Sequence, residues 1–264
     1  PRCSASPFIR VGAALPIDDV AARGFEAGAE AYEAARPSYP DEALQVLEEA
    51  VGLGPGRQVL DLAAGTGKLT RLLVDRGASV VAVEPVAAMR ARLEVTAPGV
   101  TVLDGSAEQI PLDDASVDLV TVAQAFHWFD APVALTEIAR VLRPGGHLAL
   151  LWNERDERTP WVAEMSRIIR WHERTVSRYQ HVDWQAVVGS SGRFTTLEER
   201  TTWWEQPMTV EMLADRVRSI SYIAAMPIAA RERLVGEVTA LVSRRPEPFP
   251  LPYVCRVQWA RATV

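Results

Sequence analysis

The sequence predicts an α/β protein with a mostly parallel central sheet that carries helices on both faces. Between about residues 58 and 152, short apolar runs alternate with segments of helical periodicity. The runs are apolar on both faces, which is typical of strands in a parallel sheet covered on both sides. The chain has 264 residues, and this length allows one large domain with its own hydrophobic core.

Turn and cap residues mark where each predicted strand and helix begins and ends. We predict strands at residues 59–62, 79–83, 100–103, 117–123 and 147–152, and helices at 69–75, 86–95 and 132–142. A further helix precedes the first strand. Asp41 follows Pro40, so we predict that this helix is capped near Asp41, and a glycine-rich stretch from Gly52 to Gly56 ends it.

The strand–helix alternation stops after residue 152. Residues 156–193 are helical and polar in pattern and contain Trp161, Trp171 and Trp184. A strand-like run at 194–205, helices near 209–220 and 227–243, and a strand-like run at 252–260 follow. We predict a flexible tail at residues 1–19 and a single domain at 20–264, in which 156–193 form a helical insertion after the fifth strand. Because this insertion leaves the sheet at its carboxyl edge, we expect it to be a mobile lid over the ligand site.

Composition and charge narrow the classes of function. Lys and Arg total 28 and Asp and Glu total 34, so the formal net charge is −6, which disfavours binding to nucleic acid or to an anionic membrane. Cys3 and Cys255 lie at opposite ends of the chain, and no Cys or His cluster has metal-ligand spacing. We expect no metal, no nucleic-acid partner and no membrane partner. No apolar run approaches the roughly 20 residues of a membrane span, and we expect a cytoplasmic protein.

The strongest chemical signal is the segment from Asp61 to Gly67, which joins the first predicted strand to the helix after it. Gly65 and Gly67 let the backbone approach a ligand closely, and the start of the helix offers free N–H groups. The third glycine of the dinucleotide fingerprint G-x-G-x-x-G would fall at position 70, which is Thr70. The Asp61 carboxylate would repel a pyrophosphate, and it suits a cationic or amine-bearing ligand instead.

Glu84, at the end of the second predicted strand, gives the second signal. A carboxylate at this place can accept hydrogen bonds from both hydroxyls of a ribose. Together with the glycine-containing turn, it predicts a nucleoside-type ligand.

Several motifs in a fixed order resemble the class I S-adenosylmethionine (SAM)-dependent methyltransferases. The resemblance is closest to their small-molecule branch, methyltransferase type 11 and trans-aconitate-methyltransferase-like proteins. The matching segments are the glycine loop 61–67, the acid and proline at 84–85, the loop 105–108 with 110–112, the strand 117–120 and its exit 125–130, the approach 140–146 to the fifth strand, and the short motif 35–40. The fold that this resemblance implies is a Rossmann-like sheet of seven strands.

The resemblance also implies a SAM site along the carboxyl ends of the first four strands. By analogy, Asp61 and Gly65 lie next to the methionine amine, Glu84 holds the ribose, and Met89 packs on the adenine. Arg36, assisted by Tyr32, is the candidate for the SAM carboxylate, because a guanidinium matches a carboxylate with two parallel hydrogen bonds.

The remaining cofactor-binding candidates follow from the same motifs. They are Ala63, Thr66, Gly67, Pro85, Ser106, Gln124 and Ala107, the last through its backbone N–H. Two of these residues depart from the family pattern. Ala63 replaces the first glycine of the loop and slightly crowds the ligand, and Ser106 replaces an acid that in many members binds the adenine amino group.

His127 is the candidate catalytic residue. It follows the fourth predicted strand between Phe126 and Trp128, on the side where ligands bind in open α/β sheets. Methyl transfer from a sulfonium is an in-line displacement, so the protein mainly positions the reactants. A general base is needed only where the acceptor is protonated, and His127 is predicted to serve as this base.

The expected acceptor is a small molecule that is apolar or aromatic in part, methylated at O, N or C, with S-adenosylhomocysteine as the second product. All eight tryptophans lie at or after position 128, where the family has its acceptor side and lid. Three alternatives stay open: a module on the same fold that binds SAM without turnover or catalyses a SAM-independent step, a nicotinamide oxidoreductase, and a macromolecular methyltransferase. We expect a monomer or a homodimer.

Overall fold

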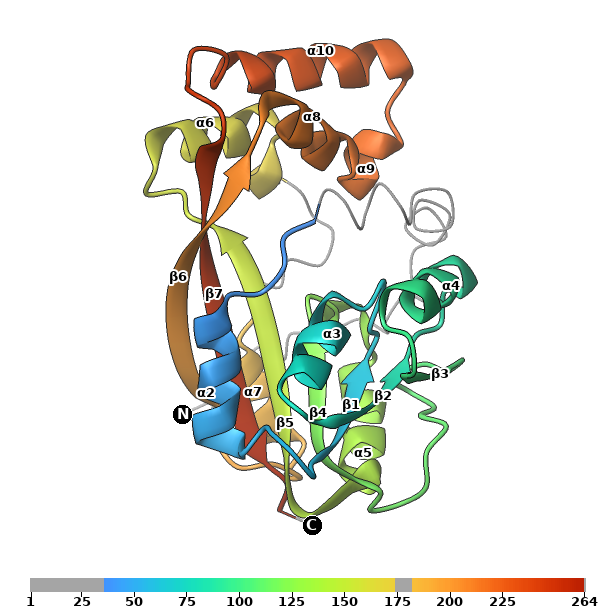
Figure 1. Cartoon of the computed structure of the whole chain (residues 1–264). Helices are drawn as coiled ribbons and strands as arrows, with labels where there is room; N and C mark the ends of the chain where they lie inside the picture. Colours follow the sequence, from blue (N-terminus) through green and yellow to red (C-terminus); the bar gives the residue numbers. More distant parts are fainter. Residues whose placement is uncertain (1–35, 174–181, 264) are drawn as a thin grey trace, which may run out of the picture.

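A seven-stranded sheet organises the computed structural model, which describes residues 36–173 and 182–263 (Figure 1). The strands are β1 (Gln58–Leu62), β2 (Ser79–Val83), β3 (Thr101–Leu103), β4 (Val117–Ala123), β5 (Leu142–Arg155), β6 (Glu198–Met208) and β7 (Phe249–Arg261), in the spatial order β3-β2-β1-β4-β5-β7-β6. β1 to β5 pair in parallel, whereas β7 is antiparallel to both β5 and β6. The predicted mostly parallel α/β fold is confirmed.

Helices cover both faces of the sheet. On one face lie α2 (Asp41–Val51), α3 (Lys68–Asp75) and α4 (Ala87–Thr96), and on the other lie α5 (Ala131–Val141) and α7 (Trp184–Ser190). The alternation in β1 shows why the strands are apolar throughout: Val59 joins the core under α2 and α3, and Leu60 joins the core under α5 and α7. A single exposed face would have allowed polar residues at every second position.

α2 begins where the sequence predicted, near Asp41, but no side chain caps it. The residue before the helix is Pro40, which has extended backbone angles, and Asp41 is the first helical residue. The Asp41 side chain bonds with Arg76 and accepts a hydrogen bond from Gln45 at 2.8 Å. A carboxylate in the first turn still interacts favourably with the positive end of the helix dipole, so the residue type fits the position although it does not cap the helix.

The three C-terminal strands of the sheet extend beyond its parallel part. β5 has 14 residues, and its pairing with β7 continues to Arg155, opposite Tyr253. The sequence predicted only the central part of β5, because Pro144 and the two glycines after it predict a turn rather than a strand. These long strands connect the parallel part of the sheet with a separate group of helices (Figure 1).

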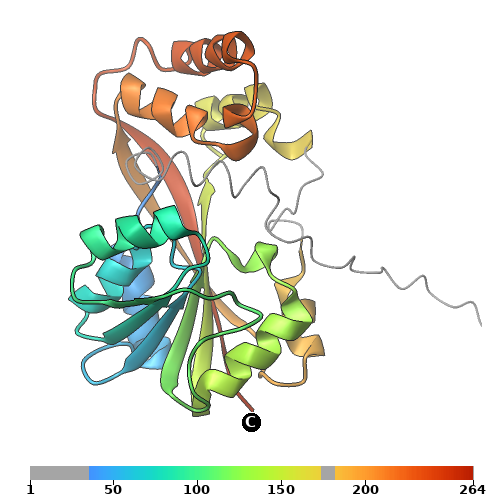
Figure 2. The ribbon, with the colours of Figure 1, turned by 90° about the vertical axis from the view of Figure 1, so that its right-hand side faces the viewer.

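This group, which we call the helical unit, consists of α6 (Pro160–Ile168), α8 (Val210–Arg218), α9 (Ser221–Ala224) and α10 (Ile228–Ala240). It has its own hydrophobic core, which includes Trp161, Leu213 and Phe249. It lies beyond the carboxyl ends of β1, β4 and β5, and both views show α10 on its outer side (Figures 1 and 2).

The predicted insertion 156–193 divides between two cores. α6 belongs to the helical unit, where Trp161 packs edge-on against Phe249, and α7 packs on the sheet with α5, where Trp184 is buried. The rest of the helical unit comes from the stretch between β6 and β7, which the sequence did not assign to a lid. The predicted tail at 1–19 lies outside the described residues. Within residues 36–173 and 182–263, no helix is both long and apolar enough to cross a membrane.

Candidate functional site

The loop between β1 and α3 has backbone angles that few residues adopt. Ala63, Gly65 and Gly67 have positive φ angles of 56°, 59° and 84°. A Cβ atom added at Gly67 would lie 3.0 Å from the Leu93 side chain of α4, whereas a Cβ at Gly65 would meet no atom within 4 Å. Gly67 is therefore required by packing inside the protein, and Gly65 faces open space where a ligand can approach the backbone.

Glu84 closes this loop from the end of β2. Its Oε2 accepts a hydrogen bond from the Gly65 N–H at 2.8 Å, and its Oε1 accepts one from the Val86 N–H at 2.9 Å. The side chain is only 5% exposed, and burial raises the pKa of Glu84 above its usual value although both N–H groups favour the charged form. Each carboxylate oxygen can still accept another hydrogen bond, as a ribose hydroxyl requires.

Asp61 is buried below the loop. It is 1% exposed and accepts hydrogen bonds from the Thr70 hydroxyl at 2.6 Å and from the Thr121 hydroxyl at 3.1 Å. Burial raises the pKa of Asp61 to about 6. The residue at the third glycine position of a dinucleotide fingerprint, Thr70, therefore anchors the loop acid of this protein. The contact of Asp61 with a methionine amine stays a prediction.

Arg90 of α4 fixes the turn after β2, a role that the sequence analysis missed. Its Nη1 donates to the carbonyl oxygens of Glu84 and Pro85, each at 2.8 Å, and to the Asp104 carboxylate at 2.9 Å. This arginine holds the backbone that carries the candidate ribose acid. An arginine six residues after such an acid, in the first turn of the next helix, is the signal that could have found it.

The candidates on the adenine side lie close to the sheet core. Met89 of α4 and Ala107 are each 3% exposed, and Ala107 belongs to the core under α5. Ser106 forms an isolated bridge with Gln109. Thr66, on the opposite side of the loop, is 1% exposed, and its carbonyl oxygen accepts a hydrogen bond from Thr96 at 2.7 Å.

The exit of β4 is the second place with unusual backbone angles. Gln124 has a φ of 58°, its N–H donates to the Leu151 carbonyl at 2.9 Å, and its Nε2 donates to the Asn153 carbonyl at 3.0 Å. Residues Ala63 and Gln124 thus both adopt the left-handed region at the ends of neighbouring strands. Strained backbone of this kind is concentrated at functional sites.

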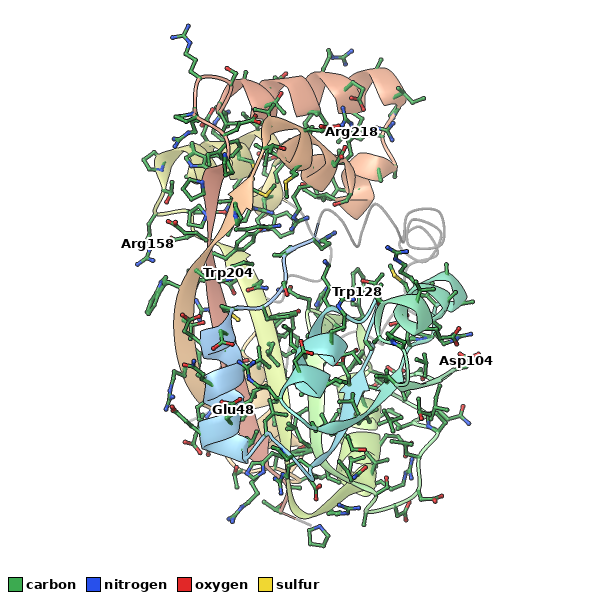
Figure 3. All side chains as sticks on the ribbon, in the orientation of Figure 1. Glu48, Asp104, Trp128, Arg158, Trp204 and Arg218 are labelled. Atoms are coloured by element: carbon green, nitrogen blue, oxygen red, sulfur yellow. The ribbon has the colours of Figure 1, made fainter. Side chains whose placement is uncertain are left out.

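His127 lies in the short helix η1 (Phe126–Trp128) that follows. Its ring centroid is 4.6 Å from that of Trp128 and 5.9 Å from that of Trp152. Burial lowers the pKa of His127 to about 3, so the imidazole is neutral at pH 7 and can accept a proton. Trp128 lies at the same edge of the sheet, toward the helical unit (Figure 3).

Most of the other tryptophans serve packing. Trp152 and Trp184 stack with centroids 5.5 Å apart, and Phe126 meets Trp184 edge-on at 5.3 Å. Trp171 lies under the Arg155 guanidinium at 4.5 Å, and Trp203 is 58% exposed. The tryptophan-rich C-terminal part of the sequence therefore reflects two hydrophobic cores more than one acceptor pocket.

Asn153 of β5 forms hydrogen bonds both with the segment before α2 and with β6, one of the strands that lead to the helical unit. Its Nδ2 donates to the Ser38 carbonyl at 2.8 Å, and its Oδ1 accepts from the Trp204 indole at 3.1 Å. Arg36, two residues before Ser38, donates to the Ser219 carbonyl at the end of α8 at 3.3 Å. The candidate SAM-carboxylate residue therefore lies where the segment before α2 meets the helical unit. Tyr32 lies outside the described residues.

The elements thus bring most of the predicted cofactor residues to one edge of the sheet, around the loop 63–67 and the ends of β2 and β4. Among the described residues, no group of three or more His, Cys, Asp or Glu side chains is placed to hold a metal ion.

Comparisons with known proteins point to one family. Residues 60–150 match the family model described as a methyltransferase domain. A methyltransferase of Mycobacterium tuberculosis, itself uncharacterized, is 44% identical over 229 residues, which cover 85% of this chain and 89% of that protein. A demethylmenaquinone methyltransferase of Beutenbergia cavernae is 39% identical over 39% of this chain and 43% of its own. The structure of phosphoethanolamine N-methyltransferase 2 of Haemonchus contortus in complex with SAM has the same fold, with a TM-score of 0.54, 17% identity, and coverage of 89% of this chain and 57% of that one.

Proposed function

Since this chain belongs to the SAM-dependent methyltransferase family, we propose that it transfers the methyl group of SAM to a small-molecule acceptor and releases S-adenosylhomocysteine. The observation that carries the proposal is the contact between the Glu84 carboxylate and the Gly65 N–H at 2.8 Å. It joins the acid that suits a ribose to the loop whose glycine faces open space.

The residues at this edge fit such a cofactor. Glu84 would hold the ribose, Met89 and Ala107 would border the adenine, and Arg36 would bind the carboxylate. Ala63 already has the positive φ that the first glycine of the family loop adopts with less strain, so its methyl group is accommodated. The solved structure of the same fold in complex with SAM supports SAM as the cofactor.

When bound, SAM would supply an activated methyl group: an acceptor lone pair would attack the methyl carbon in line and form the new bond, while the carbon–sulfur bond breaks and S-adenosylhomocysteine leaves with its electron pair. The chain's own residues bind and orient the reactants and exclude water from them. His127 is our candidate to take the proton that the acceptor loses. Because a base with a pKa of about 3 is weak, this site suits an acceptor that is acidic or that already has a free lone pair.

The acceptor that we propose is a small molecule, apolar or aromatic in part. Trp128 and His127 form an aromatic pair after β4, with ring centroids 4.6 Å apart, and an aromatic acceptor would pack well against such a pair. The Beutenbergia relative, whose name specifies demethylmenaquinone as acceptor, supports a small molecule.

The proposal is tested by calorimetric titration of the protein with SAM and with NADH, followed by detection of S-adenosylhomocysteine in the presence of an acceptor panel. Glu84→Ala should lower SAM affinity at least ten-fold, because hydrogen bonds to a charged acceptor are worth about 1.5–3 kcal/mol each. Glu94→Ala is the matched control: it removes an exposed carboxylate from α4, and SAM affinity should stay within two-fold. Unchanged SAM affinity in Glu84→Ala, or binding of NADH and not of SAM, would reject the proposal.

A further inference from the structure

Arg216 of α8 is a buried cation that has no partner among the described residues. Only 7% of the residue is exposed, and its Nε and Nη1 are buried without a hydrogen-bond acceptor. Arg218, two residues later, shows the usual arrangement: it is 39% exposed and pairs with Asp215 at 3.0 Å and Glu232 at 2.7 Å. The two arginines of one helix thus differ in what balances their charge.

A guanidinium in this state costs stability. Its charge cannot be removed at any physiological pH, and a buried charge without a partner is strongly unfavourable. Buried polar groups in native proteins nearly always have a partner, and an exception points to a missing water, ion or ligand. The planar fork of arginine fits the two oxygens of a carboxylate or phosphate.

The position of Arg216 connects it with the candidate site. Ser219, three residues later and so on the same side of the helix, has the carbonyl oxygen that accepts the hydrogen bond from Arg36. Both ribbon views place α8 on the side of α10 that faces the carboxyl edge of the sheet (Figures 1 and 2). The end of α8, three residues after Arg216, therefore lies where the helical unit contacts the segment before α2.

A second buried donor lies in β7, one of the strands that connect the helical unit with the parallel part of the sheet. The Tyr253 hydroxyl of β7 has no hydrogen-bond partner among the described residues, although the residue is 1% exposed. Its ring stacks on Trp204 at 5.2 Å, and Trp204 donates to Asn153. The helical unit and the strands below it thus offer hydrogen-bond donors whose acceptor is not part of this chain's described structure.

We propose that the Arg216 guanidinium binds an anionic group, a carboxylate or a phosphate, of the methyl acceptor. This inference rests on the proposed methyl transfer, and it narrows the acceptor to a molecule that combines an apolar or aromatic body with a negative charge. The SAM carboxylate is the competing ligand for this arginine, and Arg36 is the residue assigned to that carboxylate.

The test uses small aromatic probes that differ in charge. Benzoate, phenyl phosphate and the neutral benzamide are titrated calorimetrically into the full chain, with and without saturating S-adenosylhomocysteine. The proteins are wild type, Arg216→Met and Arg218→Met. Arg218→Met is the matched control, because it removes the same charge from an exposed place on the same helix (Figure 3).

We expect benzoate or phenyl phosphate to bind wild type at least ten-fold more tightly than benzamide does. Comparison of the two anions shows which group is preferred. Arg216→Met should lose that ten-fold preference, and Arg218→Met should keep it within three-fold. Because the described residues offer no partner for the charge, Arg216→Met should melt at the same temperature as wild type or higher.

Three results would overturn the proposal. Equal affinity for benzoate, phenyl phosphate and benzamide would show that no anion site exists. A loss of S-adenosylhomocysteine affinity in Arg216→Met with anion affinity intact would assign the arginine to the cofactor. A lower melting temperature with anion affinity intact would make the arginine structural.

Should Arg216→Met fail to fold, Arg216→Lys is the second variant. It keeps the charge but loses the planar fork, and it must still bind the anion more weakly than wild type. If wild type binds no SAM, the proposed function fails, whereas the titrations without cofactor still report on Arg216.

Discussion

The carboxyl edge of the sheet and the helical unit above it differ in how their residues find their partners. At the sheet edge, Gly65 and Glu84 lie at the ends of two parallel strands that are neighbours in the sheet, β1 and β2. In the helical unit, α6 shares a hydrophobic core with α8 and α10, which begin 50 and 68 residues after it and are reached through β6. The first region is organised by local motifs and the second by tertiary packing, so the binding of cofactor and of acceptor can change independently.

The largest effect that tests this independence is the loss of a tryptophan from each core. Trp161→Ala and Trp184→Ala should each reduce the free energy of unfolding by about 3–5 kcal/mol, the usual result for a large buried aromatic residue. Only Trp184 stacks on Trp152 next to His127, so Trp161→Ala should keep SAM affinity within three-fold. Urea unfolding followed by circular dichroism, with calorimetry for SAM, measures both. An equal loss of SAM affinity in the two variants would show that the regions act as one.

A smaller effect is expected at Asn153, the residue that joins the two regions. Asn153→Ala leaves the Ser38 carbonyl and the Trp204 indole without their partner, and each unpaired buried group costs about 1–3 kcal/mol. Because Ser38 is two residues from Arg36, SAM affinity should fall by about three-fold to ten-fold, or up to 1.4 kcal/mol. Calorimetry with SAM measures this loss.

Trp204→Phe is the control for this position, since it removes only the indole N–H and keeps a ring against Tyr253. It should reduce stability and leave SAM affinity within two-fold. If both variants lose SAM affinity equally, the connection runs through the β6 strand and not through the segment before α2.

The sequence predicted the sheet edge well for a physical reason. The runs at 79–83 and 117–123 are strands over the same residues in the structure, because turn residues bound them and both faces are buried. The ends of parallel strands meet at one edge, so the neighbourhood of Gly65 and Glu84 follows from the order of the motifs.

The residues that the sequence did not identify depend on contacts between distant segments. Asn153 bonds with residues 115 positions before it and 51 after it, and no local pattern encodes either partner. The same holds for the second half of the helical unit, whose amphipathic helices are compatible with many packing partners. Asp41 shows the opposite limit: local sequence chemistry located the start of α2 near this residue, although its side chain does not cap the helix.

The smallest predicted effect is on how the free energy of unfolding depends on pH. His127 and Asp61, the acid below the loop, contribute to this dependence with opposite signs. The folded-state pKa of His127 is about 3, and the unfolded value is about 6.5. The unfolded chain therefore binds the proton first, and the free energy of unfolding falls as the pH drops below 6.5, by about 1.4 kcal/mol at pH 5.5.

Asp61 acts in the opposite direction. Its folded pKa of about 6 exceeds its ordinary value of 3.8, so its protonation stabilises the fold as the pH falls through 6. His127→Phe keeps a ring against Trp128 and removes the imidazole that takes up the proton. Between pH 7.5 and 5.5, the free energy of unfolding of this variant should therefore fall by about 1.4 kcal/mol less than that of wild type. Asp61→Asn should instead lose more than wild type over the same range. Urea titrations at the two pH values measure all three proteins, and the same pH dependence in wild type and His127→Phe would mean that the ring is open to solvent and is not the buried neutral base of the site.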